Sequence, residues 1–212
     1  MERRDDHAID RFNPIDIHSK ASEESGIVRQ GQEVQGIART MGVMITPKLR
    51  WEGLSWIRQT TSLPLVVKGI QCVEDAVIAY QHGVQGIVLS NHGDESQDTS
   101  QAPLLTLLEI RKYAPSLIEN KMQIYLDGGI RQGTDVIKAI ALGATAVGLG
   151  RPFLYSLSAG YSEDGVLRMI HILREKITKN MAPVGAVTLN ELHPDLLNTA
   201  KIERELTGAV KL

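Results

Sequence analysis

The stretch IYLDGGIRQG, residues 124–133, decides the fold of this protein. It begins with a short apolar run, residues 124–126, which is typical of a buried strand. A glycine pair follows shortly afterwards, and residues 134–142 then place apolar side chains on neighbouring turns of a helix. The stretch therefore predicts a strand that turns into a helix through a glycine corner, which is the repeating unit of α/β folds.

Similar strands occur at three other places in the chain. Residues 65–69, 86–90 and 146–150 are short apolar runs that end in glycine or polar residues. Residues 74–82 have helical spacing, and residues 51–60 form a short helix by the same criterion. Strands that alternate with helices are parallel and are joined by right-handed crossovers. Because the strands are apolar throughout, we expect both faces of the sheet to be covered.

Two of these units repeat one another at an offset of 60 residues. Each helix of the pair ends at a glycine, as a left-handed helix end prefers, and a strand starts soon afterwards. An offset of two strand–helix units is natural in a (β/α) barrel, although the residues alone leave a doubly wound sheet open as well. The matching pairs are Asp75 with Asp135, Ala79 with Ala139, and Gly83 with Gly143.

The composition argues against several classes of function. A formal net charge of -2 offers no basic surface for a polyanion, so we expect no nucleic-acid partner. No run of about 18 apolar residues is present, so we expect no membrane span. The single cysteine, Cys72, indicates a reducing compartment and favours the cytoplasm. The end Val210-Lys211-Leu212 differs from a peroxisomal Ser-Lys-Leu signal at its first position, so peroxisomal import is the less favoured alternative.

Two glycine-rich strand ends predict a phosphate site. Residues 127–133 follow one strand and open a helix, and residues 148–152 end the next strand in the same way. Glycines let backbone N–H groups approach a ligand, Arg131 and Arg151 add guanidinium donors, and the helix N-terminus adds partial positive charge. Tight turns with solvated arginines are the alternative for either loop alone. Two consecutive strand ends with the same chemistry favour a phosphate cup, as after strands 7 and 8 of many barrels.

The two other strand ends carry ionisable side chains. Lys68 ends an apolar strand, where burial without a partner is costly, so we expect it to reach a cavity or a counter-charge. His92 lies in the loop after the next strand, with Asp98 six residues later, which suits a general base held by a carboxylate. A loop histidine with ordinary hydrogen bonds is the alternative.

Together, these strand ends resemble a known family. The motifs are VKG at residues 67–69, SNHG at 90–93, DGGIRQGTD at 127–135 and GLGRPF at 148–153. Their order and spacing are similar to those of the FMN-dependent 2-hydroxy-acid dehydrogenases and oxidases. This family includes glycolate oxidase, lactate oxidase and the flavocytochrome type of L-lactate dehydrogenase.

The resemblance implies an α/β fold and, within it, the C-terminal half (strands 5 to 8) of a TIM (β/α)8 barrel. Residues 41–212 would form this partial barrel domain, and residues 1–40 a polar, loop-rich N-terminal segment. Two open sheet edges would result, and two copies of the chain could close one barrel as a homo-oligomer.

The resemblance also implies FMN as the cofactor and oxidation of a 2-hydroxy acid to a 2-oxo acid as the activity. His92 would be the base that takes a proton from the substrate while the flavin accepts two electrons. Lys68 would stabilise the reduced ring, and Asp98 would support the histidine loop. The other cofactor-binding residues implied are Ser90, Asp127, Gly128, Gly129, Ile130, Arg131, Gly150 and Arg151.

The sequence departs from this family at the substrate position. The family has an arginine three residues after the histidine to bind the substrate carboxylate, whereas this chain has Glu95. Losing one such charged pair costs about 2–5 kcal/mol, before any repulsion is added. The sequence also lacks four of the eight strands that a full barrel of about 250 residues contains.

Three functions therefore remain open. The first is the FMN-dependent oxidoreductase. The second is a truncated or repurposed family member that binds flavin phosphate weakly or not at all and lacks hydroxy-acid oxidase activity. The third is a non-redox lyase or isomerase with His92 as its base, which ranks last because only the histidine loop supports it.

Overall fold

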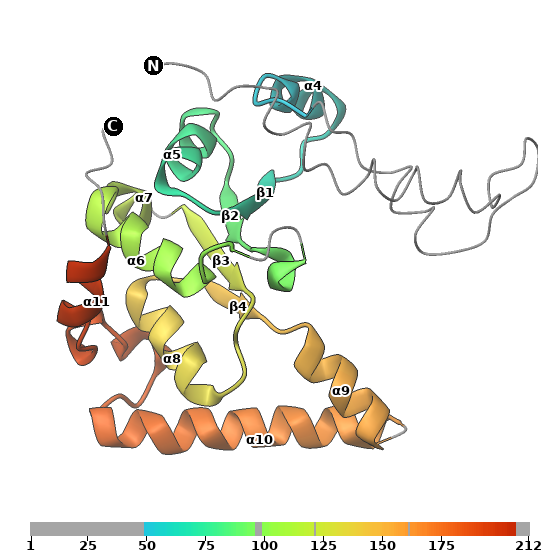
Figure 1. The fold of residues 1–212 in the computed structure, drawn as a ribbon. Helices are drawn as coiled ribbons and strands as arrows, with labels where there is room; N and C mark the ends of the chain where they lie inside the picture. The colour runs from blue at the N-terminus through green and yellow to red at the C-terminus, as the bar shows by residue number, and fades with distance from the viewer. Residues whose placement is uncertain (1–48, 96–98, 121, 161, 207–212) are drawn as a thin grey trace, which may run out of the picture. The chain divides into compact units, whose positions relative to one another are not determined.

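The computed structural model describes residues 49–95, 99–120, 122–160 and 162–206 (Figure 1). The predicted N-terminal segment, residues 1–40, and Asp98 lie outside this part of the chain. The chain divides into two units between Trp56 and Ile57, and almost all described residues belong to the second unit.

The described elements alternate between strands and helices before a helical C-terminal part. Helix α4 spans Gly53–Thr60, close to the predicted short helix. The elements that follow are β1 (Val66–Ile70), α5 (Val73–Gln81), β2 (Gly86–Leu89), η1 (His92–Asp94), α6 (Pro103–Tyr113), α7 (Ser116–Glu119), β3 (Gln123–Asp127), α8 (Gly133–Leu142), β4 (Ala146–Gly148), α9 (Arg151–Gly160), α10 (Glu163–Met181), η2 (Ala182–Val184), η3 (Leu189–Glu191), η4 (Pro194–Leu196) and α11 (Ala200–Glu205).

The four predicted strands form one parallel sheet in the order β1-β2-β3-β4. Consecutive strands lie side by side, as right-handed strand–helix units require. Strand β4 ends at Gly148, two residues earlier than the apolar run suggests, so Leu149 and Gly150 lead into α9. A register shift interrupts the pairing of β1 between Lys68 and Ile70, where Gly69 has a φ of +97°.

One face of the sheet is covered by helices α5, α6 and α8 (Figure 1). The side chains that point to these helices form the core of the second unit. They are fully buried on the two central strands, since Ile87, Leu89, Ile124 and Leu126 each have 0% exposure. Burying a side chain of this size contributes about 1.5–3 kcal/mol, so these strands hold the sheet against its helices.

The opposite face of the sheet, for which the sequence also predicts a cover, is accessible in the described part of the chain. Lys68, Val88, Tyr125 and Ala146 are aligned across the four strands, and none of them is buried. Val66, on the same face, is 44% exposed. Apolar strands indicate only that a cover is needed, and in the described residues no element supplies one for this face. In a barrel the corresponding face turns inward toward the remaining strands.

The helix ends follow the sequence prediction. Gly83, after α5, has a φ of +71°, and Gly143, after α8, has a φ of +111°. Both values lie in the left-handed region that ends helices at glycine. The start of α8 packs closely on α10, because a Cβ on Gly133 would lie 2.6 Å from the Ile177 nitrogen. Glycine at this position therefore sets the distance between the two helices.

No helix in the described ranges combines the length and the apolar character that crossing a bilayer requires.

Candidate functional site

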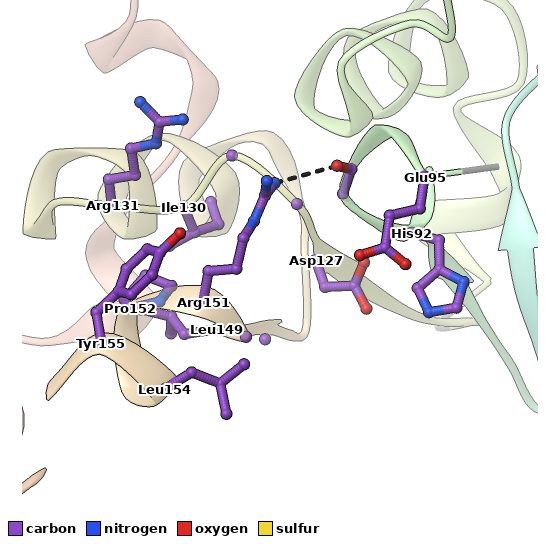
Figure 2. A pocket seen from close by; sticks show the side chains of 15 residues that line it. His92, Glu95, Asp127, Ile130, Arg131, Leu149, Arg151, Pro152, Leu154 and Tyr155 are labelled. Carbon is purple, nitrogen blue, oxygen red and sulfur yellow. Dashed lines mark hydrogen bonds between the residues drawn. The ribbon is translucent and has the colours of Figure 1, made fainter. Parts of the chain in front are cut away.

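A hollow of about 680 Å³ lies at the carboxyl end of the sheet (Figure 2). Its volume falls within the range of about 300–1,000 Å³ that small-molecule sites occupy. The hollow brings together nine of the predicted site residues: His92, Glu95, Asp127, Gly128, Gly129, Ile130, Arg131, Gly150 and Arg151. Lys68 and Ser90 do not line it, and Asp98 lies outside the described residues.

The two glycine corners form the floor of the hollow. Gly128 and Gly129 have φ values of +91° and +79°, so the backbone turns through conformations that side chains rarely allow. Nothing lies within 4 Å of a Cβ built on Gly129 or Gly150. Among the hydrogen bonds between described residues, none uses the amide N–H of either glycine. These two amides are therefore free to donate to an anion.

The chain's own carboxylate binds two backbone amides just before α8. The Asp135 carboxylate accepts hydrogen bonds from the backbone N–H groups of Arg131 and Gln132, with both N–O distances at 3.0 Å. This is the capping-box arrangement, in which the third residue of a helix binds back to its start. The backbone N–H groups of Arg131 and Gln132 are thus occupied by the chain's own carboxylate, whereas those of Gly129 and Gly150 remain available.

The two arginines enter the hollow from successive strand–helix loops. Arg131 follows the first glycine corner, and Arg151 begins α9 after the second. Both side chains are exposed, and Figure 2 shows both extending from the rim formed by these loops. The Arg151 Nη2 also donates a hydrogen bond to the Gly93 carbonyl oxygen at 3.1 Å. The guanidinium groups of two arginines therefore line the same hollow and give it positive charge.

Lys68 has the polar partners that its position demands. Its Nζ donates to the Ser90 Oγ at 2.9 Å and lies 3.7 Å from the Asp127 Oδ2. Because Asp127 lines the hollow, this cluster adjoins it although Lys68 itself does not line it. The ends of β1, β2 and β3 are thereby tied together by side chains.

The histidine loop has an unusual backbone. His92, Gly93 and Asp94 have φ values of 54°, 69° and 69°, all left-handed. Asn91 stabilises this turn, because its Oδ1 accepts from the Gly93 N–H at 3.0 Å and its Nδ2 donates to the Asp94 Oδ1 at 2.6 Å. The turn leaves the His92 side chain exposed at the rim of the hollow.

Glu95 places a carboxylate in the hollow. It lines the same space as His92 and Asp127, and Figure 2 draws its side chain between those two residues. The hollow therefore carries two carboxylates, from Glu95 and Asp127, and two guanidinium groups, from Arg131 and Arg151. An anion in it would be attracted by the guanidinium groups and repelled by the carboxylates.

Sequence reasoning missed three contributors to this site. Asn91 is buried and shapes the histidine loop, although it lies inside the quoted SNHG motif. Leu154 and Tyr155 line the hollow from the first turns of α9. A helical projection of residues 151–155 beyond the glycine corner could have indicated them.

Other reactive groups lie away from the hollow. Burial raises the pKa of the Cys72 thiol to about 11. Because the thiolate is the nucleophilic form, Cys72 is unreactive here and packs as a small side chain. Within the described ranges, no group of three or more His, Cys, Asp or Glu residues is arranged to hold a metal ion.

Comparison with known proteins identifies relatives of this chain. The sequence matches the family described as FMN-dependent dehydrogenase over residues 3–199. It is 38% identical over 200 residues to L-lactate dehydrogenase (cytochrome) of Wickerhamomyces anomalus, covering 92% of this chain and 35% of that protein. It is 41% identical over 157 residues to glycolate oxidase 3 of Arabidopsis thaliana, covering 74% of this chain and 41% of that protein.

Solved structures agree with these relatives. A double variant of flavocytochrome b2 with sulfite bound has a TM-score of 0.71 and 41% identity, covering 79% of this chain and 43% of that chain. A mandelate oxidase with (S)-4-hydroxymandelic acid has a TM-score of 0.62 and 38% identity, covering 69% of this chain and 40% of that chain. The chain thus spans less than half the length of each of these relatives.

Proposed function

The chain belongs to the FMN-dependent dehydrogenase family, and on this basis we propose that it is the FMN-binding part of an oxidoreductase that converts a 2-hydroxy acid into a 2-oxo acid. The observation that carries the proposal is the single hollow lined by the two glycine corners, the two arginines and His92. A base beside a phosphate cup would lie close to a cofactor that the cup holds.

The hollow fits the phosphate end of FMN. Gly129 and Gly150 offer free amide N–H groups with open space above them. Arg131 and Arg151 add donors that carry the positive charge a phosphate dianion requires. We propose that these four residues hold the phosphate, and that Asp127, Gly128 and Ile130 contact the adjoining ribityl chain.

The residues around the histidine would then have distinct roles. FMN, when bound, accepts two electrons from the substrate. His92 would accept the proton that the 2-hydroxy acid loses. Lys68, held by Ser90 and Asp127, supplies positive charge that would offset the negative charge of a reduced ring.

We further propose that the four strands are strands 5 to 8 of a (β/α)8 barrel, within a domain of residues 41–212 that follows an N-terminal segment of residues 1–40. The sheet face without a cover among the described residues supports this assignment. A homo-oligomer, in which a second copy of the chain packs on this face, is the partner that we propose; a molar mass of two chains in solution would support it and a monomeric mass would oppose it. The proposed location is the cytoplasm, in preference to the peroxisome, and rests on the single cysteine.

Glu95 favours a second candidate function. A carboxylate substrate beside His92 would meet the carboxylates of Glu95 and Asp127 in the same hollow. A repurposed family member could keep the phosphate cup, bind flavin weakly, and no longer oxidise hydroxy acids. The two candidates differ in whether a bound flavin is reduced.

Titration with FMN, followed by flavin fluorescence, tests the cofactor. The loaded protein is then mixed under anaerobic conditions with a panel of 2-hydroxy acids, and the loss of flavin absorbance is recorded. Riboflavin, which lacks the phosphate, is the matched control and is expected to bind at least about tenfold more weakly. Binding with reduction supports the oxidoreductase, and binding without reduction supports the repurposed protein. Equal affinity for FMN and riboflavin, or no flavin binding, would contradict the phosphate cup.

A further inference from the structure

Arg151 joins the two loops that carry the proposed chemistry. Its Nη2 donates a hydrogen bond to the Gly93 carbonyl oxygen at 3.1 Å, across 58 residues of sequence (Figure 2). Gly93 directly follows His92, and Arg151 directly follows Gly150 of the second glycine corner. A side chain at the phosphate cup therefore holds the backbone of the loop with the proposed base.

The contact between Arg151 and Gly93 is close. A Cβ built on Gly93 would lie 3.0 Å from the Arg151 Nη2 and 3.4 Å from its Cζ. The guanidinium thus lies against the Gly93 backbone, in a space that a larger residue would fill. A guanidinium has five N–H donors, and the described contact uses one of them. The others remain available for an anion in the hollow that Arg151 lines.

The loop that Arg151 contacts has an energetically unfavourable backbone. Both His92 and Asp94 have left-handed φ values, 54° and 69°, although neither is a glycine. Such a conformation costs about 1–2 kcal/mol for each residue. It persists where the surrounding contacts fix it, so each contact to the loop affects how well His92 is ordered.

The other contacts to the loop come from its own neighbourhood. Ser90 accepts a hydrogen bond from the His92 N–H at 3.2 Å, and Asn91 binds both Gly93 and Asp94. Ser90 and Asn91 are buried, and neither lines the hollow. Arg151 is exposed and comes from a different strand–helix unit. Among these contacts it is the one that a ligand in the hollow can change.

We propose that Arg151 is a positioning residue that transmits occupancy of the phosphate cup to the loop of His92. A phosphate in the cup would bind the remaining donors of the guanidinium and fix the side chain. The fixed guanidinium would then hold the Gly93 carbonyl more firmly. This inference rests on the proposed function in one respect, because it needs a phosphate, free or as part of FMN, in the cup.

Hydrogen exchange of two amides tests the coupling in the full chain. The N–H groups of Gly93 and Asp94 both donate to Asn91, so their exchange rates report on the order of the loop. The rates are measured by NMR without ligand and with inorganic phosphate, FMN or riboflavin. Phosphate and FMN are expected to slow exchange by roughly tenfold, the order expected of one charge-assisted hydrogen bond, whereas riboflavin is not.

Three variants separate coupling from binding. Arg151→Gln removes the guanidinium and should abolish the slowing even at saturating phosphate. Arg151→Lys keeps a charge for phosphate but has no planar fork to span two acceptors, so it should bind without slowing exchange. Arg131→Gln is the matched control. Arg131 lines the same hollow, but its side chain has no hydrogen bond to described residues of the loop, so this variant should need more phosphate and still show full slowing.

The outcomes distinguish the coupling from the proposed function. An Arg151→Gln variant that shows the wild-type slowing, or an equal effect of riboflavin, overturns the coupling. FMN that binds without changing either amide also overturns it and leaves the proposed function standing. Inorganic phosphate that slows exchange while FMN fails to bind supports the coupling and contradicts the proposed function. If neither ligand binds, both are overturned.

Discussion

The Lys68 ammonium donates a hydrogen bond to the Ser90 hydroxyl, with 2.9 Å between Nζ and Oγ. The same Nζ lies 3.7 Å from the Asp127 Oδ2, and the two side chains of this ion pair are 51% and 29% exposed. An exposed pair contributes only about 0–1 kcal/mol to stability. The cluster therefore adds little to the stability of the fold. Its main effect is to hold a positive charge beside the hollow.

Lys68→Met should have little effect on the free energy of unfolding. It should have a larger effect on the reduction potential of bound FMN. We expect the free energy of unfolding to change by less than about 1 kcal/mol in urea. The reduction potential of bound FMN should fall by about 20–40 mV, because the negative charge of the reduced ring loses a cation. An anaerobic redox titration measures this shift. Lys138→Met, at an exposed position on α8, is the control, and an equal fall there would contradict the role of Lys68.

Glu95→Arg should restore the binding of carboxylates. Replacing a repelling carboxylate with a guanidinium beside His92 changes an interaction worth about 2–5 kcal/mol, or roughly 30-fold to several thousand-fold in affinity. Calorimetry with oxalate measures binding, and kcat/KM for 2-hydroxy acids measures turnover. Glu95→Gln removes the charge without adding a clamp and should show a smaller gain. No gain in either variant would show that residue 95 does not face the substrate.

Two glycine substitutions should separate structure from binding. Gly133→Ala should destabilise the fold by about 2 kcal/mol or more, because the new Cβ would lie 2.6 Å from the Ile177 nitrogen. Gly129→Ala should cost about 1 kcal/mol for its φ of +79° but weaken FMN binding at least about tenfold, since it fills the cradle. Urea denaturation and FMN titration measure the two effects. Equal FMN affinity in wild type and Gly129→Ala would argue against the cradle.

Truncating a core side chain between the sheet and its helices should destabilise the fold. Ile124 is 0% exposed in β3, so Ile124→Ala should lower the free energy of unfolding by about 2–5 kcal/mol. Val187 is 85% exposed, so Val187→Ala should change the free energy of unfolding by less than about 0.5 kcal/mol. Similar losses in the two variants would mean that the helix-covered face is not the core.

Cys72 should be unreactive in the folded protein. Burial raises the pKa of its thiol from 9.0 to about 11, so about one thousandth is thiolate at pH 8. A disulfide reagent should modify it slowly in the folded chain and rapidly in urea. Because the folded state favours the neutral thiol, its stabilisation is present below pH 9.0 and is lost as the pH rises through about 11. Fast modification of the folded protein at pH 8 would contradict this.

The local sequence was sufficient to predict the repeating strand–helix units of this fold. Apolar runs predicted the four strands, and Gly83 and Gly143 predicted two helix ends, because short-range backbone preferences determine both. What covers the second face of the sheet was not predictable in the same way. An apolar strand such as β3 indicates that cover is needed but not which segment supplies it.

The parts of the site that lie within one sequence motif could be predicted from the sequence. The glycine corner with Arg131 was predicted, whereas the cap by Asp135 was overlooked, although both residues belong to the same motif. A carboxylate three residues into a helix competes with an anionic ligand for the same amides, and the sequence does not say which prevails. The contact between Arg151 and Gly93 joins residues 58 positions apart, so it needed the fold to be known.

The two outer edges of the sheet offer little backbone to a neighbouring molecule. Strand β4 has three residues, and β1 pairs regularly over residues 66–68 before the shift at Gly69. Short edges interrupted by a bulge are poor templates for the endless strand addition that produces fibrils. Among the described residues one face of the sheet has no cover, yet its short and interrupted edges disfavour growth into amyloid-like ribbons.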